Sequence, residues 1–280
     1  MIRVELAKQL RRPRTCLTLA ALVAFGVVLT IALVATGAGR LEHVGDVPLL
    51  IVPRSSGLTV PVIALSSTMK FFLPLAVAIF AGEAVAGEAG WGSLRYGLAR
   101  GVSRPRFLLS KAIVAALLSI VAVVLLTIGS LAAGVIVFGW HPLVAGDGSA
   151  STALQQANAV FSQGSALARL GIATAYVMGG MVSIFAFAFF LSTITSRPLV
   201  AVAGGVGLTI VSRLLNADYL SGIAVLNPYM PNNDVDLWQH LLQQPAQTAG
   251  MTHFLLVQLG YAVVFLSLGW WWFSRKDVLT

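Results

Sequence analysis

The sequence predicts an all-α polytopic membrane protein with six transmembrane helices and both termini in the cytoplasm. Three observations predict this class. Hydrophobic residues make up 58% of the 280-residue chain and charged residues only 10%, against about 25% charged in soluble domains. Uncharged runs long enough to cross a bilayer recur along the chain. Lys and Arg gather in alternate connections between these runs, which is typical of the cytoplasmic side.

We expect a single transmembrane domain over residues 1–280, because six helices of about 20 residues with their connections use the whole length. The first uncharged run, residues 15–39, exceeds the roughly 7 to 15 residues of a signal-peptide core, so it is interpreted as a retained helix. The predicted spans cover residues 15–36, 66–86, 112–138, 170–194, 198–215 and 254–273.

Two of these spans depend on charged residues near their ends. The second carries Lys70 near one interface and Glu83 near the other, and the glutamate is the costlier group to place there. The fifth lies between Arg197 and Arg213, with only 15 uncharged residues between them. Both arginines must therefore reach toward the headgroups for this segment to span.

The orientation follows from the cationic residues, because short connections rich in Lys and Arg stay cytoplasmic. With six spans, 13 of the 18 Lys and Arg fall on one side, together with both termini. These residues are Arg3, Lys8, Arg11, Arg12, Arg14, Arg95, Arg100, Arg104, Arg106, Lys111, Arg197, Arg275 and Lys276.

Several kinds of site are disfavoured by composition. The cations are dispersed around apolar segments, which argues against a nucleic-acid surface. A single cysteine, Cys16, excludes a disulfide within the chain, and the four isolated histidines predict no metal site. No phosphate-binding G-x-x-x-x-G-K-[ST] motif occurs, so the chain is expected to bind no cofactor and to carry no catalytic residues or ATPase site of its own.

Glu83 and Glu88 are the acids nearest to a membrane-spanning segment that could form a functional pair. Five residues apart on a helix, they point to different faces, and Glu88 is interpreted as ending the second helix at the cytoplasmic interface. No chain of carboxylates follows in spans three to six, which argues against a proton-coupled or sodium-coupled carrier.

A further short amphipathic helix is predicted outside the membrane, beginning at Asn233 or Asp234 and continuing to Gln244. It is expected to lie along the outer surface, with one apolar face made of Val235, Trp238, Leu241 and Leu242.

The most informative segment is the connection between the second and third spans, GEAGWGSLRYGLARGVSRPRFLLSK over residues 87–111. Trp91, Leu94 and Leu98 repeat at helical spacing within a strongly cationic stretch. Such a stripe can lie on anionic lipid or dock on a protein, and physical chemistry alone favours lipid contact.

This connection resembles that of the type-2 ABC exporter permease family, in which it reads GE, then GTLR, then LARPVSR, and then the lysine that opens the third helix. Ser93 replaces the usual threonine, and Gly101 replaces the usual proline, which loosens the turn after the helix. The resemblance extends more weakly to the opening VELAKQLRRPRT, the NPY at residues 227–229 and the ending WFSRKDV. The matching residues are Gly87, Glu88, Gly92, Ser93, Leu94, Arg95, Leu98, Arg100, Arg104 and Lys111.

The resemblance implies a permease subunit of a bacterial plasma-membrane ABC transporter that exports a small hydrophobic substrate. A cytoplasmic coupling helix containing Gly87, Glu88, Trp91, Gly92, Ser93, Leu94, Arg95, Leu98, Arg100 and Arg104 is expected to contact a separate ATP-binding subunit, which binds ATP and Mg. An interfacial helix over residues 2–13, with Arg3, Lys8, Arg11 and Arg12, is expected to lie on membrane lipid. A second permease copy or homologue completes the transporter. The alternatives are an ATP-independent carrier or channel, or a membrane anchor that recruits a soluble partner.

Overall fold

The computed structural model describes residues 2–35, 56–90, 92, 103–145, 159–215, 227–242, 246 and 248–275. The described part is mainly helical, as predicted, with one short hairpin in addition. The elements are α1 (Ile2–Leu10), α2 (Pro13–Ala35), α3 (Thr59–Thr68), α4 (Phe72–Gly90), α6 (Arg104–Phe138), β1 (Leu143–Ala145), β2 (Ala159–Phe161), α7 (Gln163–Gly180), α8 (Val182–Ile194), α9 (Pro198–Leu215), the 3-10 helix η2 (Asp234–Leu242) and α10 (Met251–Arg275).

Within the described residues, six helical segments are long and apolar enough to span a membrane, which confirms the predicted number. They are α2, α4, α6, the α7–α8 pair, α9 and α10. The α7–α8 pair counts as one segment because backbone hydrogen bonds continue through the junction, from Met181 N to Val177 O (3.1 Å) and from Phe185 N to Met181 O (3.0 Å). The chain therefore has the build of a multi-pass membrane protein.

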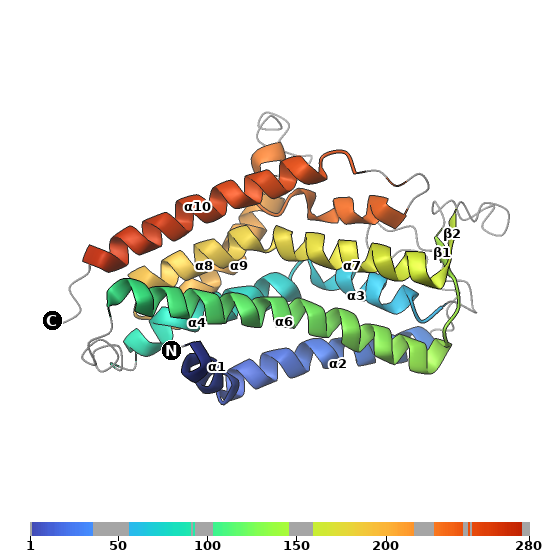
Figure 1. Ribbon diagram of the computed structural model, residues 1–280, viewed down its shortest axis with the longest axis horizontal. Coiled ribbons are helices and arrows are strands. Elements are labelled where there is room, and N and C mark those ends of the chain that lie inside the picture. Colours follow the sequence, from blue (N-terminus) through green and yellow to red (C-terminus); the bar gives the residue numbers. More distant parts are fainter. Residues whose placement is uncertain are drawn as a thin grey trace.

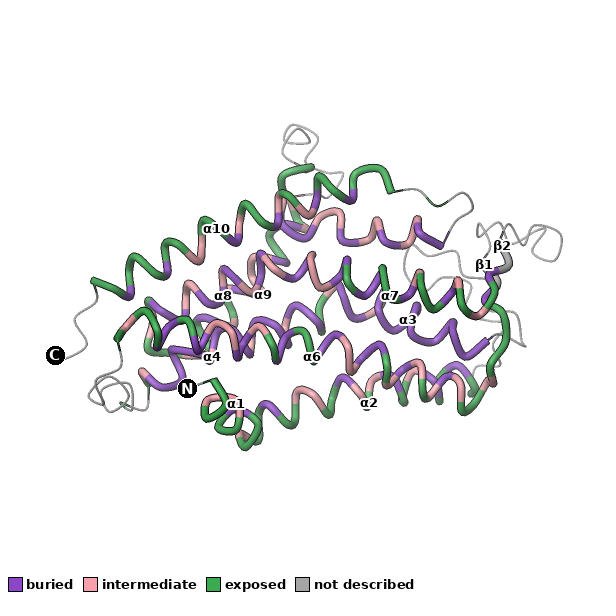
Figure 2. The backbone as a smooth tube through the Cα atoms, viewed as in Figure 1, coloured by how far each residue is buried: buried purple, intermediate pink, exposed green. Residues whose placement is uncertain are grey.

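The spanning helices run along the long axis of the molecule (Figure 1). The helix α1, the end of α4, the start of α6 and the end of α10 lie together at one end, here called the α1 end. The strands β1 and β2 mark the opposite hairpin end, where Leu143, Val144 and Ala145 pair antiparallel with Phe161, Val160 and Ala159. Figure 2 shows that α3 and most of α4 form the buried centre, whereas α10 and much of α2 are exposed on the outside.

The predicted second span, residues 66–86, is interrupted in the structure. A separate buried helix, α3, ends at Thr68, and α4 begins only at Phe72. Pro74 explains the break, because the ring of a helical proline clashes with the carbonyl group four residues earlier, here that of Lys70. A break before Phe72 leaves Pro74 in the first turn of α4, where no helical hydrogen bond to its nitrogen is needed.

The predicted amphipathic segment is η2, and its apolar face is buried against protein. Val235, Trp238, Leu241 and Leu242 are at most 5% exposed. Trp238 Nε1 donates to Met69 Sδ (3.1 Å), and the Tyr176 hydroxyl donates to Asp234 O (2.8 Å). The guanidinium of Arg169 on α7 donates to Leu241 O. These contacts hold η2 against α7 and the α3–α4 turn, so protein covers its apolar face.

The position of Asp234 on η2 makes stability depend on pH. Burial raises the pKa of its carboxyl group above the usual range, and the nearby His253 opposes this only in part. Because the folded-state pKa is the higher one, ionisation of Asp234 disfavours the folded state. The free energy of unfolding therefore falls as pH rises from the unfolded-state pKa, about 4, through the raised folded-state pKa.

Replacing this carboxyl group with an amide is expected to remove that pH dependence. Asp234→Asn should match the wild type most closely in apparent Tm at about pH 3, where the carboxyl group is mostly protonated in both the folded and the unfolded state. At pH 7 it should be the more stable protein, by about 1 kcal/mol or less, because the carboxylate is only half-buried. Thermal unfolding of the detergent-solubilised proteins at the two pH values tests this. An equal difference at both would contradict the assignment.

Candidate functional site

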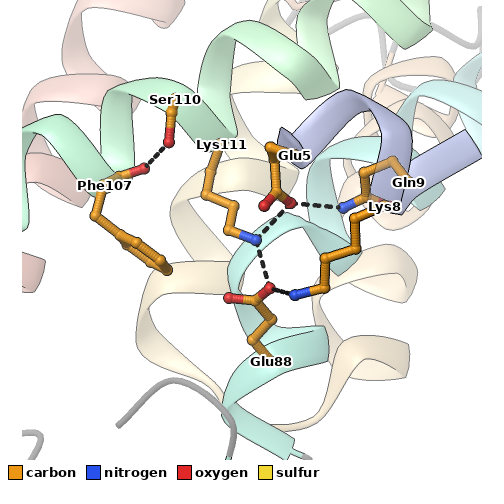
Figure 3. Close-up of polar contacts among 7 residues, drawn as sticks. All are labelled: Glu5, Lys8, Gln9, Glu88, Phe107, Ser110 and Lys111. Carbon is orange, nitrogen blue, oxygen red and sulfur yellow. Dashed lines mark hydrogen bonds and ion pairs between the residues drawn. The ribbon is translucent and has the colours of Figure 1, made fainter. Parts of the chain in front are cut away.

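Four charged side chains meet at the α1 end and form three ion pairs with one another. Glu5 and Lys8 come from α1, Glu88 from the last turn of α4, and Lys111 from the third turn of α6. Figure 3 shows Lys111 pointing between the two carboxylates, with Lys8 reaching Glu88 from the other side. We call these four residues the ion cluster. It joins three helices that are far apart in sequence.

The geometry of the ion cluster is that of a continuous chain of ion pairs. Lys111 Nζ lies 2.5 Å from Glu5 Oε1 and 2.7 Å from Glu88 Oε1, and Lys8 Nζ pairs with the same Glu88 oxygen. The side chains of Lys111 and Glu88 are 1% and 5% exposed, whereas that of Lys8 is 47% exposed. Two acids face two bases, so the cluster is neutral as a whole. A buried charge is tolerated only when it is paired in this way.

The start of α6 is also connected to the end of α10. The Arg104 guanidinium donates to Ser274 O (3.1 Å), and the Phe107 ring stacks on Phe273 with 6.2 Å between centroids. The Lys111 ammonium lies 5.4 Å from the centre of the same Phe107 ring, a cation–π contact. The first three turns of α6 therefore contact α1, α4 and α10.

A second ion pair ties α2 to α4 one turn away from Glu88. Arg14 Nη1 lies 2.8 Å from Glu83 Oε1. The Glu83 side chain is 16% exposed, whereas the Arg14 side chain is largely exposed. Glu83 and Glu88 thus point to different partners, as their spacing predicted. Glu88 lies in the last turn of α4, and its side chain is buried and paired with Lys8 and Lys111.

The sequence-predicted coupling residues fall partly within the described chain. Gly87 and Glu88 lie near the end of α4 and are buried, and Arg104 is the first residue of α6. Gly92 follows α4 with φ of +66°, a left-handed conformation in which glycine is preferred and which ends a helix. Outside the described residues lie Trp91, Ser93, Leu94, Arg95, Leu98 and Arg100.

The predicted interfacial helix, residues 2–13, is α1 with the turn that follows it. Arg3 and Arg11 are exposed, and Lys8 combines an exposed side chain with its contact to Glu88. Arg12 borders Gly87 on α4. This basic segment is therefore docked on α4 and α6 through its charges, in addition to presenting exposed apolar residues such as Val4, which is 74% exposed.

Sequence reasoning missed the two residues that complete the cluster. Lys111 was considered only as the end of the connection, and Glu5 was not considered at all. A signal existed for Lys111, because a lysine inside a long apolar helix requires a carboxylate partner. Nothing in a single sequence identifies which carboxylate that is, since Glu5 lies 106 positions away.

Elsewhere the described chain offers no obvious reactive centre. No group of three or more His, Cys, Asp or Glu side chains that could hold a metal ion occurs in the ranges that the structure describes. A groove of about 350 Å³ separates α6 from α7 and is almost entirely apolar. Its polar atoms are the hydroxyls of Thr127 and Thr174, 3.4 Å apart. A second cavity of about 120 Å³ adjoins it at Met178. These grooves suit apolar molecules.

The region that matches a known protein family includes two of the four residues of the ion cluster. A family profile with the description "Protein of unknown function (DUF2705)" matches residues 42–279. The "Uncharacterized protein YhcI" of Bacillus subtilis (strain 168) is 26% identical over 246 residues, which cover 85% of this chain and 73% of that protein. The range of the family match includes Glu88, Lys111 and the connection between them, whereas α1 lies outside it.

Proposed function

We propose a function from the premise that this chain belongs to the family described as "Protein of unknown function (DUF2705)". The chain is the membrane-spanning permease subunit of an ATP-driven exporter in a bacterial plasma membrane. A separate ATP-binding subunit hydrolyses ATP with Mg, and its closure moves the connection between α4 and α6. A second permease copy or homologue completes the path through which a small hydrophobic substrate leaves.

The observation that carries this proposal is the position of the ion cluster. It lies near the end of α4 and the start of α6, the two helices that residues 91–102 connect. The connection leaves α4 two residues after Glu88 and enters α6 seven residues before Lys111, and these two side chains are 2.7 Å apart. A force on the connection therefore reaches α4 and α6 together, and α1 through Glu5 and Lys8. Buried ion pairs resist separation, so the three helices move as one body.

Charge and composition support the other parts of the proposal. The α1 end carries exposed arginines such as Arg3 and Arg11 on and after α1, and Arg197, whose neighbour Ser196 lies beside Gly90 at the end of α4. These cations favour a cytoplasmic location for this end and for both termini. No phosphate-binding motif occurs in the chain, so the energy source is a partner. Apolar grooves along α6 and α7 support a hydrophobic substrate.

Co-purification tests the proposal directly. The chain is co-expressed with a candidate ATPase encoded beside it, and the complex is reconstituted in vesicles. We expect the two to co-purify, and ATPase activity to rise at least several-fold over that of the ATPase alone. Substrate flux by the purified chain without any ATPase would instead support a carrier or channel. Stable binding of the soluble partner without ATPase stimulation would support an anchor.

Reversing the charge of the connection is expected to uncouple the complex. Arg95→Glu with Arg100→Glu should reduce the stimulation of ATPase activity at least tenfold, because both arginines lie within the segment that meets the partner. Arg104 is left unchanged, since its contact with Ser274 supports the fold. The measurement is ATP hydrolysis by the co-purified complex in vesicles.

The matched control reverses the same number of charges at the same end. Arg197→Glu with Arg275→Glu alters two exposed arginines outside the connection. This control should retain most of the stimulation. Equal loss in both double variants would show that net charge matters and the connection does not, and full activity of the Arg95 and Arg100 variant would refute its coupling role.

A further inference from the structure

Several buried polar side chains have atoms with no hydrogen-bond partner among the residues that the structure describes. Two of these side chains, Thr209 and Arg213, belong to α9, and three others lie in another part of the bundle. These three are Ser183 on α8, Gln258 on α10 and Asn232 just before η2, and their exposures are 0%, 1% and 1%. The unpartnered atoms are Ser183 Oγ and both polar atoms of each amide. An unpaired polar group in an apolar surrounding costs about 1–3 kcal/mol, so three at one place require an explanation.

Helix packing places Ser183 and Gln258 opposite each other. Gly180 faces Phe254, since a Cβ on this glycine would lie 3.3 Å from the Phe254 ring, and Gly179 faces Leu255 closely. Ser183 and Gln258 each follow these positions by three to four residues, which is one helical turn. One to two turns further on, Phe187 meets Phe265 with 4.8 Å between ring centroids. We call the line of contact between the α7–α8 pair and α10 the seam. The two polar residues therefore lie on this seam, at the same level along the helices.

Asn232 reaches this level from the segment that precedes η2. At one end of the segment, the Tyr261 hydroxyl of α10 donates to Tyr229 O (3.1 Å). At the other end, Val235 packs against Gly180 of α7. The segment thus crosses from α10 to α7 directly over the seam, and Asn232 lies in its middle with a left-handed φ of 65°.

We propose that Ser183, Asn232 and Gln258 form a water-binding site between α8, α10 and residues 229–235. None of the three carries a charge, and together they offer both donors and acceptors, so the site can hydrogen-bond water. Their near-zero exposure requires that residues 229–235 move away before water enters. Hydration then supplies the missing hydrogen bonds and opens the polar part of a path toward the hairpin end.

This site goes beyond the export function proposed above, and only its use as a path rests on that function. Its tests use the purified chain without any ATPase, so a failure here is distinguishable from a failure of the coupling proposal. The single natural cysteine, Cys16, is first replaced by serine so that an introduced cysteine reports alone.

Cysteine labelling tests entry of water to the site. Ser183→Cys is nearly isosteric, and it is treated with a charged methanethiosulfonate reagent that reacts only where water enters. The control is Ala188→Cys on the same helix, which is equally buried (0%) but packs against Ala78 and Gly205. We expect labelling at position 183 to be at least tenfold faster than at 188. Equal rates, or no labelling at 183, would overturn the proposal.

Stability provides a second test that needs no introduced cysteine. Gln258→Leu removes an unpaired amide, so the apparent Tm should rise by about 3 °C or more. The control is Thr127→Val, because the Thr127 hydroxyl is buried but already donates to Val123 O (3.1 Å). This control should show no rise. An unchanged or lower Tm for Gln258→Leu would show that the amide already has hydrogen-bond partners before residues 229–235 move, and it would overturn the proposed entry of water by that movement.

Discussion

Replacing Lys111 with methionine is expected to destabilise the protein by about 3–5 kcal/mol, the range for breaking one side of a buried ion pair. The ammonium of Lys111 pairs with both Glu5 and Glu88, and methionine of similar length removes this buried positive charge from beside the two carboxylates. The same loss is expected for Glu88→Gln, which leaves two ammonium groups with Glu5. Thermal and denaturant unfolding of the solubilised proteins measures both.

The double variant distinguishes charge balance from packing. Glu88→Gln with Lys111→Met leaves one acid and one base, so the cluster becomes neutral again. We expect the double variant to lose about 1–3 kcal/mol less than the sum of the two single losses. Simple additivity would show that the two residues act separately and would remove the physical basis for joint movement of α4 and α6.

Lys8 supplies the matched control for this series. Lys8→Met makes the same chemical change in the same cluster, but the Lys8 side chain is 47% exposed and well solvated. A loss of no more than about 1 kcal/mol is expected, as for other exposed ion pairs. A loss as large as that of Lys111→Met would show that burial does not set the strength of these pairs.

Gly134→Val is expected to cause the largest packing defect, a loss of about 3 kcal/mol or more. A Cβ at this position of α6 would lie 2.5 Å from Gly57 O and 2.8 Å from the Val60 side chain. The contact is with backbone, which cannot rotate away. The adjoining chain is held in place by a hydrogen bond from Gly57 N to Gly139 O (3.0 Å). The fully buried α3 must therefore move.

Apparent Tm values and the yield of folded protein from membranes measure this effect. Gly260→Ala on α10 is the control, because a Cβ there meets nothing within 4 Å and the position is exposed. It should be neutral or slightly stabilising, since alanine favours helix over glycine. Equal Tm values for Gly134→Val and the wild type would show that α3 is not packed as closely against α6 as described.

The positions of the spanning helices were largely predictable. A helix in lipid must satisfy its own backbone hydrogen bonds, so long uncharged runs report its location. The predicted span over residues 198–215 coincides with α9 despite its short uncharged core. The interruption at residues 69–71 was also encoded locally, in Pro74, but the prediction treated this segment as continuous. Because the predicted span ran through this interruption, α3 was not predicted as a separate helix.

The candidate site was predictable only in outline. The loop pattern pointed to Glu88 and Arg104, and both lie where the connection meets its helices. Burial and pairing of Glu88 were not predictable, because they depend on Lys8 and Lys111 from distant positions. In the same way, no local pattern indicates that Ser183, Asn232 and Gln258 share one level of the bundle.

By itself, the sequence determined that this chain forms mainly apolar helices, because hydrophobicity and helical hydrogen bonding act within single segments. In the described part of the chain, six helical segments are long enough to span a membrane. Only the tertiary structure decided which helices touch. It brought α1, α4 and α6 together around a neutral set of two acids and two bases, and it buried η2 against α7. The physical reason is that pairing energies depend on distance between side chains, which no property of one segment specifies.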